Sequence, residues 1–194
     1  MARIASGEVG VHHEGREYIF RPSFRRMDEL EQDWGIRDQW DDLRSEIDDV
    51  RYGTAAIVLW AFFTGSDEDA LNLTGYKRDI YHDGEFAGTV YVPGIMDQDE
   101  QVVIAMALLR NGLCGVSNFV DKKSDTDSFS SGKFNAYDFV FAIAQNLEIS
   151  KTEAEDMTMA EYHQALKVMN PERFVDMTEE NEKTDALLKA VGWE

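Results

Sequence analysis

Histidine side chains are the first residues here that could do acid–base chemistry or bind a metal, but their spacing favours neither. His12 and His13 are adjacent, so in a strand their side chains point to opposite faces and make a poor chelating pair. His82 lies beside an Asp-Gly turn and is expected to be exposed. His163 has no second histidine at HExxH spacing and is expected on the solvent side of a helix. All four are interpreted as non-catalytic.

The other candidates for chemistry are equally weak. Cys114, the only cysteine, follows an apolar run, which predicts a small buried thiol rather than a nucleophile. The acidic segment Asp121–Asp127 lacks the Gly and Glu that an EF-hand loop needs at fixed positions. No P-loop, GxSxG, dinucleotide or zinc signature occurs. The sequence therefore predicts no catalytic residue, no cofactor and no metal site, and we expect a protein that is not an enzyme.

Charge narrows the range of partners. The 194 residues include 38 Asp and Glu against 19 Lys and Arg, a net charge of −19. Such a field repels phosphates, so neither direct nucleic-acid binding nor binding to an anionic membrane surface is expected. The acidity could provide solubility, attract a basic protein or imitate DNA. The longest apolar run, Ala55–Phe63, is too short to cross a bilayer, and no secretion signal is recognisable, so an intracellular protein is expected.

The elements that would position these residues are mostly helical. The patterns predict a mainly α fold with an α+β minority, made of one or two β-hairpins: 7–21, which turns at Glu14-Gly15, and 79–94, which turns at Asp83-Gly84 but is weakened as a strand pair by Gly88. Apolar spacing predicts one amphipathic helix over 36–50, packed across two central helices at 55–63 and 101–110. Further helix starts are indicated by the following residues: Ser23, Thr54 before 55–63, Ser66 and Asp97, with Gly112 closing 101–110.

The stretch from Phe134 to Phe174 contains two helical patterns and two capping boxes. Ser150 with Glu153, and Thr158 with Glu161, have the spacing in which hydroxyl and carboxylate satisfy each other's backbone amides. Asn170-Pro171 ends the second pattern. The apolar stripe of the first helix is predicted to comprise Tyr137, Val140, Phe141, Ala144 and Leu147.

These elements suggest a division of the chain. Residues 1–116 would form an N-terminal hairpin and helical body, 117–133 a polar loop or linker, and 134–194 a C-terminal helical unit, with Thr184 starting a short last helix.

One helical face is a candidate binding surface. Met159, Tyr162, Leu166 and Met169 share a face, and Met-bearing faces adapt to varied apolar ligands. We single out Tyr162, Leu166 and Met169 as partner-binding residues, which could contact a client or a second copy. The alternative is that they belong to the core, and their exposure decides between the two.

Three stretches resemble a known family. GREYIFRPSFRRM (15–27) resembles the opening hairpin of a group of small phage proteins, and PGIMDQDEQVVIAMALLRNGLCG (93–115) resembles their central helix. FAIAQNLEISKTEAEDMTMAEYHQAL (141–166) is similar to the ending of tail assembly chaperones from phages with long flexible tails.

The resemblance implies a non-catalytic chaperone that binds and solubilises the tape-measure protein. The tail tube protein is a possible second partner. It implies action in the cytoplasm of the infected bacterial host, absence from the mature virion and association of several copies. Two alternatives remain open: an acidic DNA mimic that inhibits a host nuclease or defence system, and a structural minor tail protein.

Overall fold

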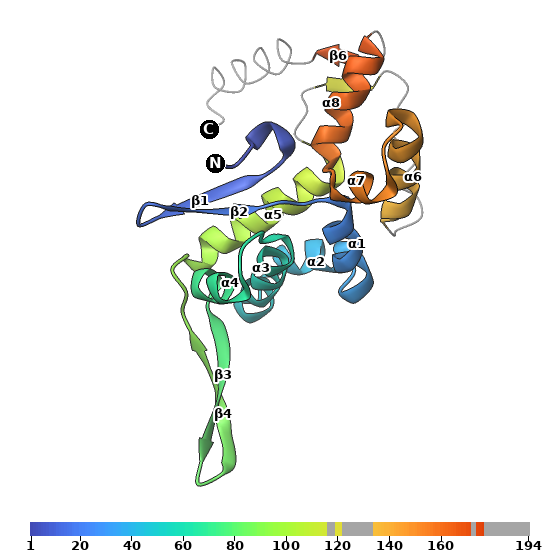
Figure 1. Ribbon diagram of the computed structural model, residues 1–194. Coiled ribbons are helices and arrows are strands. Elements are labelled where there is room, and N and C mark those ends of the chain that lie inside the picture. The colour runs from blue at the N-terminus through green and yellow to red at the C-terminus, as the bar shows by residue number, and fades with distance from the viewer. Residues whose placement is uncertain (116–118, 122–133, 172–173, 177–194) are drawn as a thin grey trace, which may run out of the picture.

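The computed structural model describes residues 1–115, 119–121, 134–171 and 174–176, and its fold is mainly α with short hairpins (Figure 1). The described helices are η1 (Ile4–Ser6), α1 (Phe24–Asp33), α2 (Ile36–Leu43), α3 (Asp48–Phe62), α4 (Asp67–Thr74), α5 (Gln98–Cys114), α6 (Ala136–Leu147), α7 (Lys151–Asp156) and α8 (Met159–Met169). The described strands form three antiparallel pairs: β1 (Val9–His13) with β2 (Arg16–Phe20), β3 (Tyr76–His82) with β4 (Glu85–Val92), and β5 (Phe119–Asp121) with β6 (Phe174–Asp176).

The main core lies between α3 and α5, with α1, α2 and α4 around them and the β1–β2 hairpin alongside (Figure 1). The hairpin predicted at 7–21 is confirmed, and its Glu14-Gly15 turn has the two positive φ angles that a tight hairpin turn requires. Phe20 pairs with Phe63 just after α3, and the Thr64 amide donates to the Ile19 carbonyl, so the hairpin is tied to the end of α3.

The prediction of one helix over 36–50 is wrong, because the chain breaks between α2 and α3. The Ser45 hydroxyl accepts from the Ile47 amide at 3.1 Å, a local bond that competes with helix continuation. Asp48 and Asp49 then occupy the first turn of α3, where carboxylates favour a helix start. Ile47 is exposed, and Thr54, predicted to cap a helix at 55–63, lies buried inside α3.

The end of α5 also differs from the prediction. Gly112 does not close this helix, which runs from Gln98 to Cys114 and ends at Gly115 with φ 72°. Gly112 lies instead against Met27 of α1, and a Cβ at this position would meet the Met27 sulfur. The glycine therefore makes room for the Met27 side chain, at a position where the sequence suggested a helix end.

Gln39 is a polar residue buried where α2 faces the core. Its side chain is only 4% exposed, and its Oε1 atom has no hydrogen-bond partner in the described part of the chain. A buried acceptor without a partner costs free energy, and methionine fills a similar volume without one. Gln39→Met should raise the free energy of unfolding by about 1 kcal/mol, measured by urea unfolding. Gln145→Met, at an exposed position of α6, should leave it unchanged; an equal gain there would contradict this reasoning.

A second apolar cluster joins α1 to the C-terminal helices. Phe24 of α1 is buried among Val140, Ile143 and Met159, and its ring stacks on Phe139 at 5.7 Å. The Phe24 amide also donates to the Met157 carbonyl. The helices of the unit predicted at 134–194 thus pack directly on the N-terminal body.

The predicted stripe of α6 is only partly correct. Val140 is buried, with Ala136 and Ile143 beside it on the inner face, but Tyr137 and Phe141 are exposed. Lys151 lies over both of these rings, 4.7 Å and 5.6 Å from their centroids. Both predicted capping boxes are confirmed, and Asn170 ends α8 as expected. The predicted loop over 117–133 and the helix at Thr184 fall largely or wholly outside the described residues.

Candidate interaction surface

A two-stranded arm, β3–β4, projects from the helical body and is the most prominent feature of the surface (Figure 1). The arm, defined as Tyr76–Val92, follows α4 after the single residue Gly75. Every residue of β3 is exposed, so packing against the helical body does not account for the length of this strand. Asp83 and Gly84 turn its tip with φ angles of 52° and 85°, the positive values of a type I′ turn. The hairpin predicted at 79–94 is therefore present and begins three residues earlier.

The root of the arm is anchored to the body by polar and close backbone contacts. The Thr74 carbonyl accepts from the Tyr91 hydroxyl at 2.6 Å and from the side-chain Nε2 of Gln101 at 3.0 Å. Gly75 and Gly94 face each other here, and a Cβ on either would collide with backbone atoms of the other strand or of Leu73. These contacts fix the direction in which the arm leaves the body.

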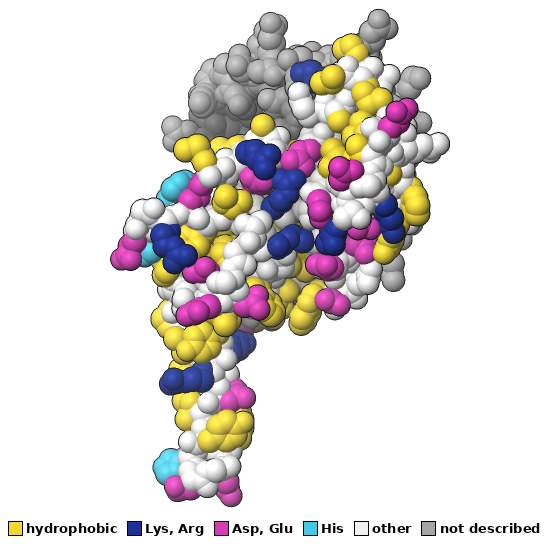
Figure 2. Space-filling model, in the orientation of Figure 1, with side chains coloured by type: hydrophobic (Ala, Val, Ile, Leu, Met, Phe, Trp, Pro, Cys, Tyr) yellow, Lys and Arg dark blue, Asp and Glu magenta, His cyan; other side chains and the backbone are white. Residues whose placement is uncertain are grey.

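Figure 2 shows hydrophobic side chains at the surface along the arm, and residues of both its faces are exposed. The register places Tyr76, Arg78 and Ile80 of β3 on one face of the arm. Their partners on β4, which are Val92, Val90 and Gly88, lie on the same face, because paired residues of an antiparallel ladder share a face. On the other face, near the tip, Tyr81 and Phe86 meet edge to face at 6.0 Å and are 62% and 61% exposed. An isolated two-stranded hairpin is marginal in water, and this one exposes apolar groups on both faces, which makes it a candidate interaction surface.

The predicted partner-binding face of α8 is graded from buried to exposed. Met159, at its start, is buried in the second cluster. Tyr162 packs against this cluster and is half-buried, as is Leu166. Met169, at the end of the helix, is 49% exposed. Of the three predicted residues, Tyr162 thus serves the core at least in part, and Met169 is the one whose side chain is most available.

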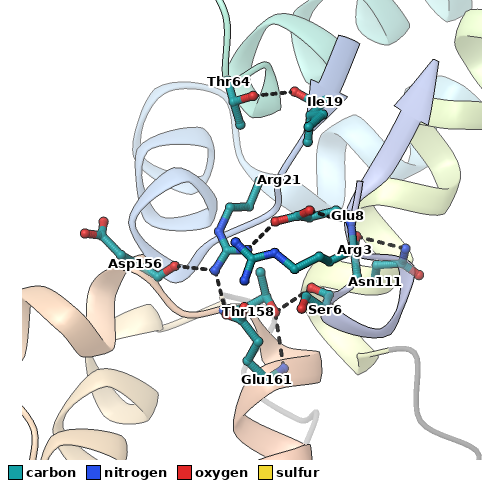
Figure 3. Close-up of polar contacts among 11 residues, drawn as sticks. Arg3, Ser6, Glu8, Ile19, Arg21, Thr64, Asn111, Asp156, Thr158 and Glu161 are labelled. Carbon is teal, nitrogen blue, oxygen red and sulfur yellow. Dashed lines mark hydrogen bonds and ion pairs between the residues drawn. The ribbon is translucent and has the colours of Figure 1, made fainter. Parts of the chain in front are cut away.

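Arg21 holds α8 against the N-terminal segments (Figure 3). Its guanidinium donates to Glu8 at 2.5 Å, to Glu161 at 2.6 Å and to the Asp156 carbonyl at 3.1 Å. Burial opposes the charge of Arg21, but the bonds to Glu161 and Glu8 outweigh it and raise the pKa of the guanidinium above its ordinary value. Nearby, the Thr158 hydroxyl donates to the Ser6 carbonyl at 2.7 Å. This Arg21 hub links the chain start, the β2–α1 junction and α8.

The histidines and the cysteine singled out in the sequence lie in different surroundings. Within the described ranges, no group of three or more His, Cys, Asp or Glu side chains is placed to hold a metal ion. His12 and His82 are exposed, whereas His163, expected on the solvent side, is half-buried beside Tyr162. The prediction of a buried Cys114 thiol is wrong: Cys114 is the last residue of α5 and is exposed. No described helix is long and apolar enough to cross a membrane.

Sequence analysis did not single out the arm as a binding surface. Its turn and strands could be predicted from the residue types. The alternation of its side chains, however, does not reveal that both faces of the hairpin lie uncovered by helices. The signal present in the sequence is the run of three consecutive charged residues, Lys77, Arg78 and Asp79, which puts charge on both faces of the strand and is unusual for a strand that packs on a core.

Together, the fold and this surface define a mainly α protein with a projecting β-ribbon. The chain belongs to the family of unknown function DUF6246, whose model matches residues 44–186. The matched segment includes the arm and α6–α8 and excludes β1, β2 and α1. Comparison with curated proteins gives no match, and comparison with solved structures gives none either.

Proposed function

We propose that this protein is a non-catalytic tail assembly chaperone that binds and solubilises a phage tape-measure protein before the tail tube forms around it. The observation that supports the proposal is the arm, an element with exposed apolar side chains on both faces that contact with a protein client would cover. The resemblance of 15–27, 93–115 and 141–166 to phage proteins supplies the specific role.

The surface chemistry supports a sheltering role. A tape-measure protein is a long helical chain with apolar faces, which aggregates when left bare. A chaperone for it needs adaptable apolar contacts on a strongly charged particle. Met169 and Val168 provide such contacts at the exposed end of α8, and the net charge of −19 would keep coated complexes apart.

Co-expression with the tape-measure protein of the same phage tests this function. We expect the tape-measure protein to be recovered in the soluble fraction together with this chain, and to be insoluble without it. Purified virions should lack this chain by mass spectrometry. Independent solubility of the two proteins, or a fixed amount of this chain in virions, would contradict the proposal and favour a minor tail protein.

A pair of α8 variants locates the client contact. Met169→Glu should lower recovery of soluble tape-measure protein several-fold, because it places a charge on the apolar end of α8. Gln164→Glu adds the same charge on the opposite, exposed side of the same helix and should leave recovery unchanged. Equal recovery with both variants would exclude the α8 face as the contact.

A further inference from the structure

We infer that two copies of this chain associate through their arms, which cross antiparallel about a twofold axis with the Tyr76–Ile80 faces in contact. The inference rests on the proposed function only in treating the arm as a binding element; it concerns a second copy of this chain and not the client.

Charge is the first argument for a second copy. Arg78, near the root of the arm and on this face, forms no ion pair within the described part of the chain, whereas Glu85 lies on the same face at the tip. Two chains of net charge −19 repel each other, so a stable contact must bring opposite charges together locally. A second arm lying antiparallel places the basic root of each copy beside the acidic tip of the other.

Shape is the second argument. Ile80 is paired with Gly88, where an added Cβ would meet no atom within 4 Å, so this rung has a large side chain beside an empty position. When the twofold axis passes through this rung, the Ile80 side chains of the two copies lie against each other, and the open space beside each at Gly88 gives both side chains room to pack. The same arrangement sets the Arg78–Val90 rung of each arm over the His82–Glu85 rung of its partner, so that Arg78 lies over His82 and reaches diagonally across the ribbon toward Glu85.

The apolar stripe is the third argument. Tyr76, Ile80 and Val90 are all exposed on this face, and they are the groups that association would remove from water. The seven residues of β3 span about 23 Å at about 3.3 Å per residue, so the contact is small. A small interface of this kind is expected to form a concentration-dependent dimer rather than a permanent one.

Crosslinking of adjacent positions tests the geometry. In a Cys114→Ser background, Ile80→Cys should be linked into a dimer by a short bis-maleimide, because residue 80 lies at the twofold axis. Tyr81→Cys is the matched control, since the neighbouring residue points to the opposite face of the ribbon and should remain largely monomeric. Equal linking of both variants, or of neither, would overturn the proposed arrangement.

Charge reversal tests the pairing. Sedimentation analysis over a range of concentrations should show that Arg78→Glu shifts the full-length chain several-fold toward monomer, and that Arg78→Glu combined with Glu85→Arg restores the dimer. Circular dichroism should show unchanged helix content in both variants, because both positions are exposed. A wild-type chain that is monomeric throughout, or a dimer insensitive to Arg78→Glu, would overturn the inference.

The two proposals fail separately. Solubilisation of the tape-measure protein by a strictly monomeric chain would leave the proposed function standing and remove the arm-mediated dimer. A dimer with the expected crosslinks that has no effect on the tape-measure protein would do the reverse.

Discussion

Arg21→Met should lower the free energy of unfolding by about 3 kcal/mol. The guanidinium contacts Glu8, whose side chain is 6% exposed, and Glu161 on α8. Methionine keeps the apolar stem but leaves the Glu8 carboxylate buried without its cation, and an uncompensated buried charge is among the costliest defects in a fold. Urea unfolding measures the loss, and amide hydrogen exchange should show faster exchange in α8.

Arg25→Met is the control for this change. Arg25 lies on the same segment and pairs with Glu155 and Asp156, but its side chain is more exposed. Exposed ion pairs contribute less than about 1 kcal/mol, so Arg25→Met should have a small effect. Glu8→Gln combined with Arg21→Met should recover part of the stability, because the orphaned charge is removed with its partner. Equal losses for Arg21→Met and Arg25→Met would show that the Arg21 hub is not a stabilising feature.

Gly94→Ala should also destabilise the protein by about 3 kcal/mol, because overpacking against backbone atoms leaves nothing that can rotate away. A Cβ at position 94 would collide with the Gly75 nitrogen and the Leu73 carbonyl, at the root of the arm. Thermal unfolding measures the loss. In crosslinking from position 80, the same variant should give a lower dimer yield, because the root must open.

Gly53→Ala is the matched control and should have the opposite sign. Gly53 lies inside α3, has no positive φ angle, and an added Cβ would meet no atom within 4 Å. Alanine favours a helix over glycine by about 1 kcal/mol, so this variant should be more stable than the parent. A Gly94→Ala variant as stable as the parent would show that the arm root is not closely packed.

The local signals of the fold were readable from the sequence, because each depends on a few neighbouring residues. The capping boxes at Ser150 and Thr158, and the turns at Glu14-Gly15 and Asp83-Gly84, all occur where their residue types indicate. The break between α2 and α3 was missed, because apolar spacing continues through Ile47 although its side chain faces solvent. Apolar periodicity alone cannot predict a local hydrogen bond such as the one that the Ile47 amide donates to the Ser45 hydroxyl.

Features that depend on contacts between residues far apart in the sequence could not be predicted. Gly112 signalled a helix end in sequence, whereas its structural role depends on Met27, which belongs to another helix. Likewise, Tyr137 and Phe141 have the spacing of a buried stripe, but the neighbours of α6 cover its other side. The predicted binding residues Tyr162, Leu166 and Met169 share one face of α8 but differ in exposure. Their exposure depends on how far along the helix each lies, and helical periodicity does not contain that information.

The burial of Phe24 among α6–α8 has a consequence for synthesis on the ribosome. More than a hundred residues separate Phe24 from Phe139, the ring it stacks on. At about 5–20 residues per second, the nascent chain carries this aromatic ring uncovered for roughly 5 to 25 s before its cover is translated. Slower elongation between the two would lengthen that interval and increase losses to aggregation or proteolysis.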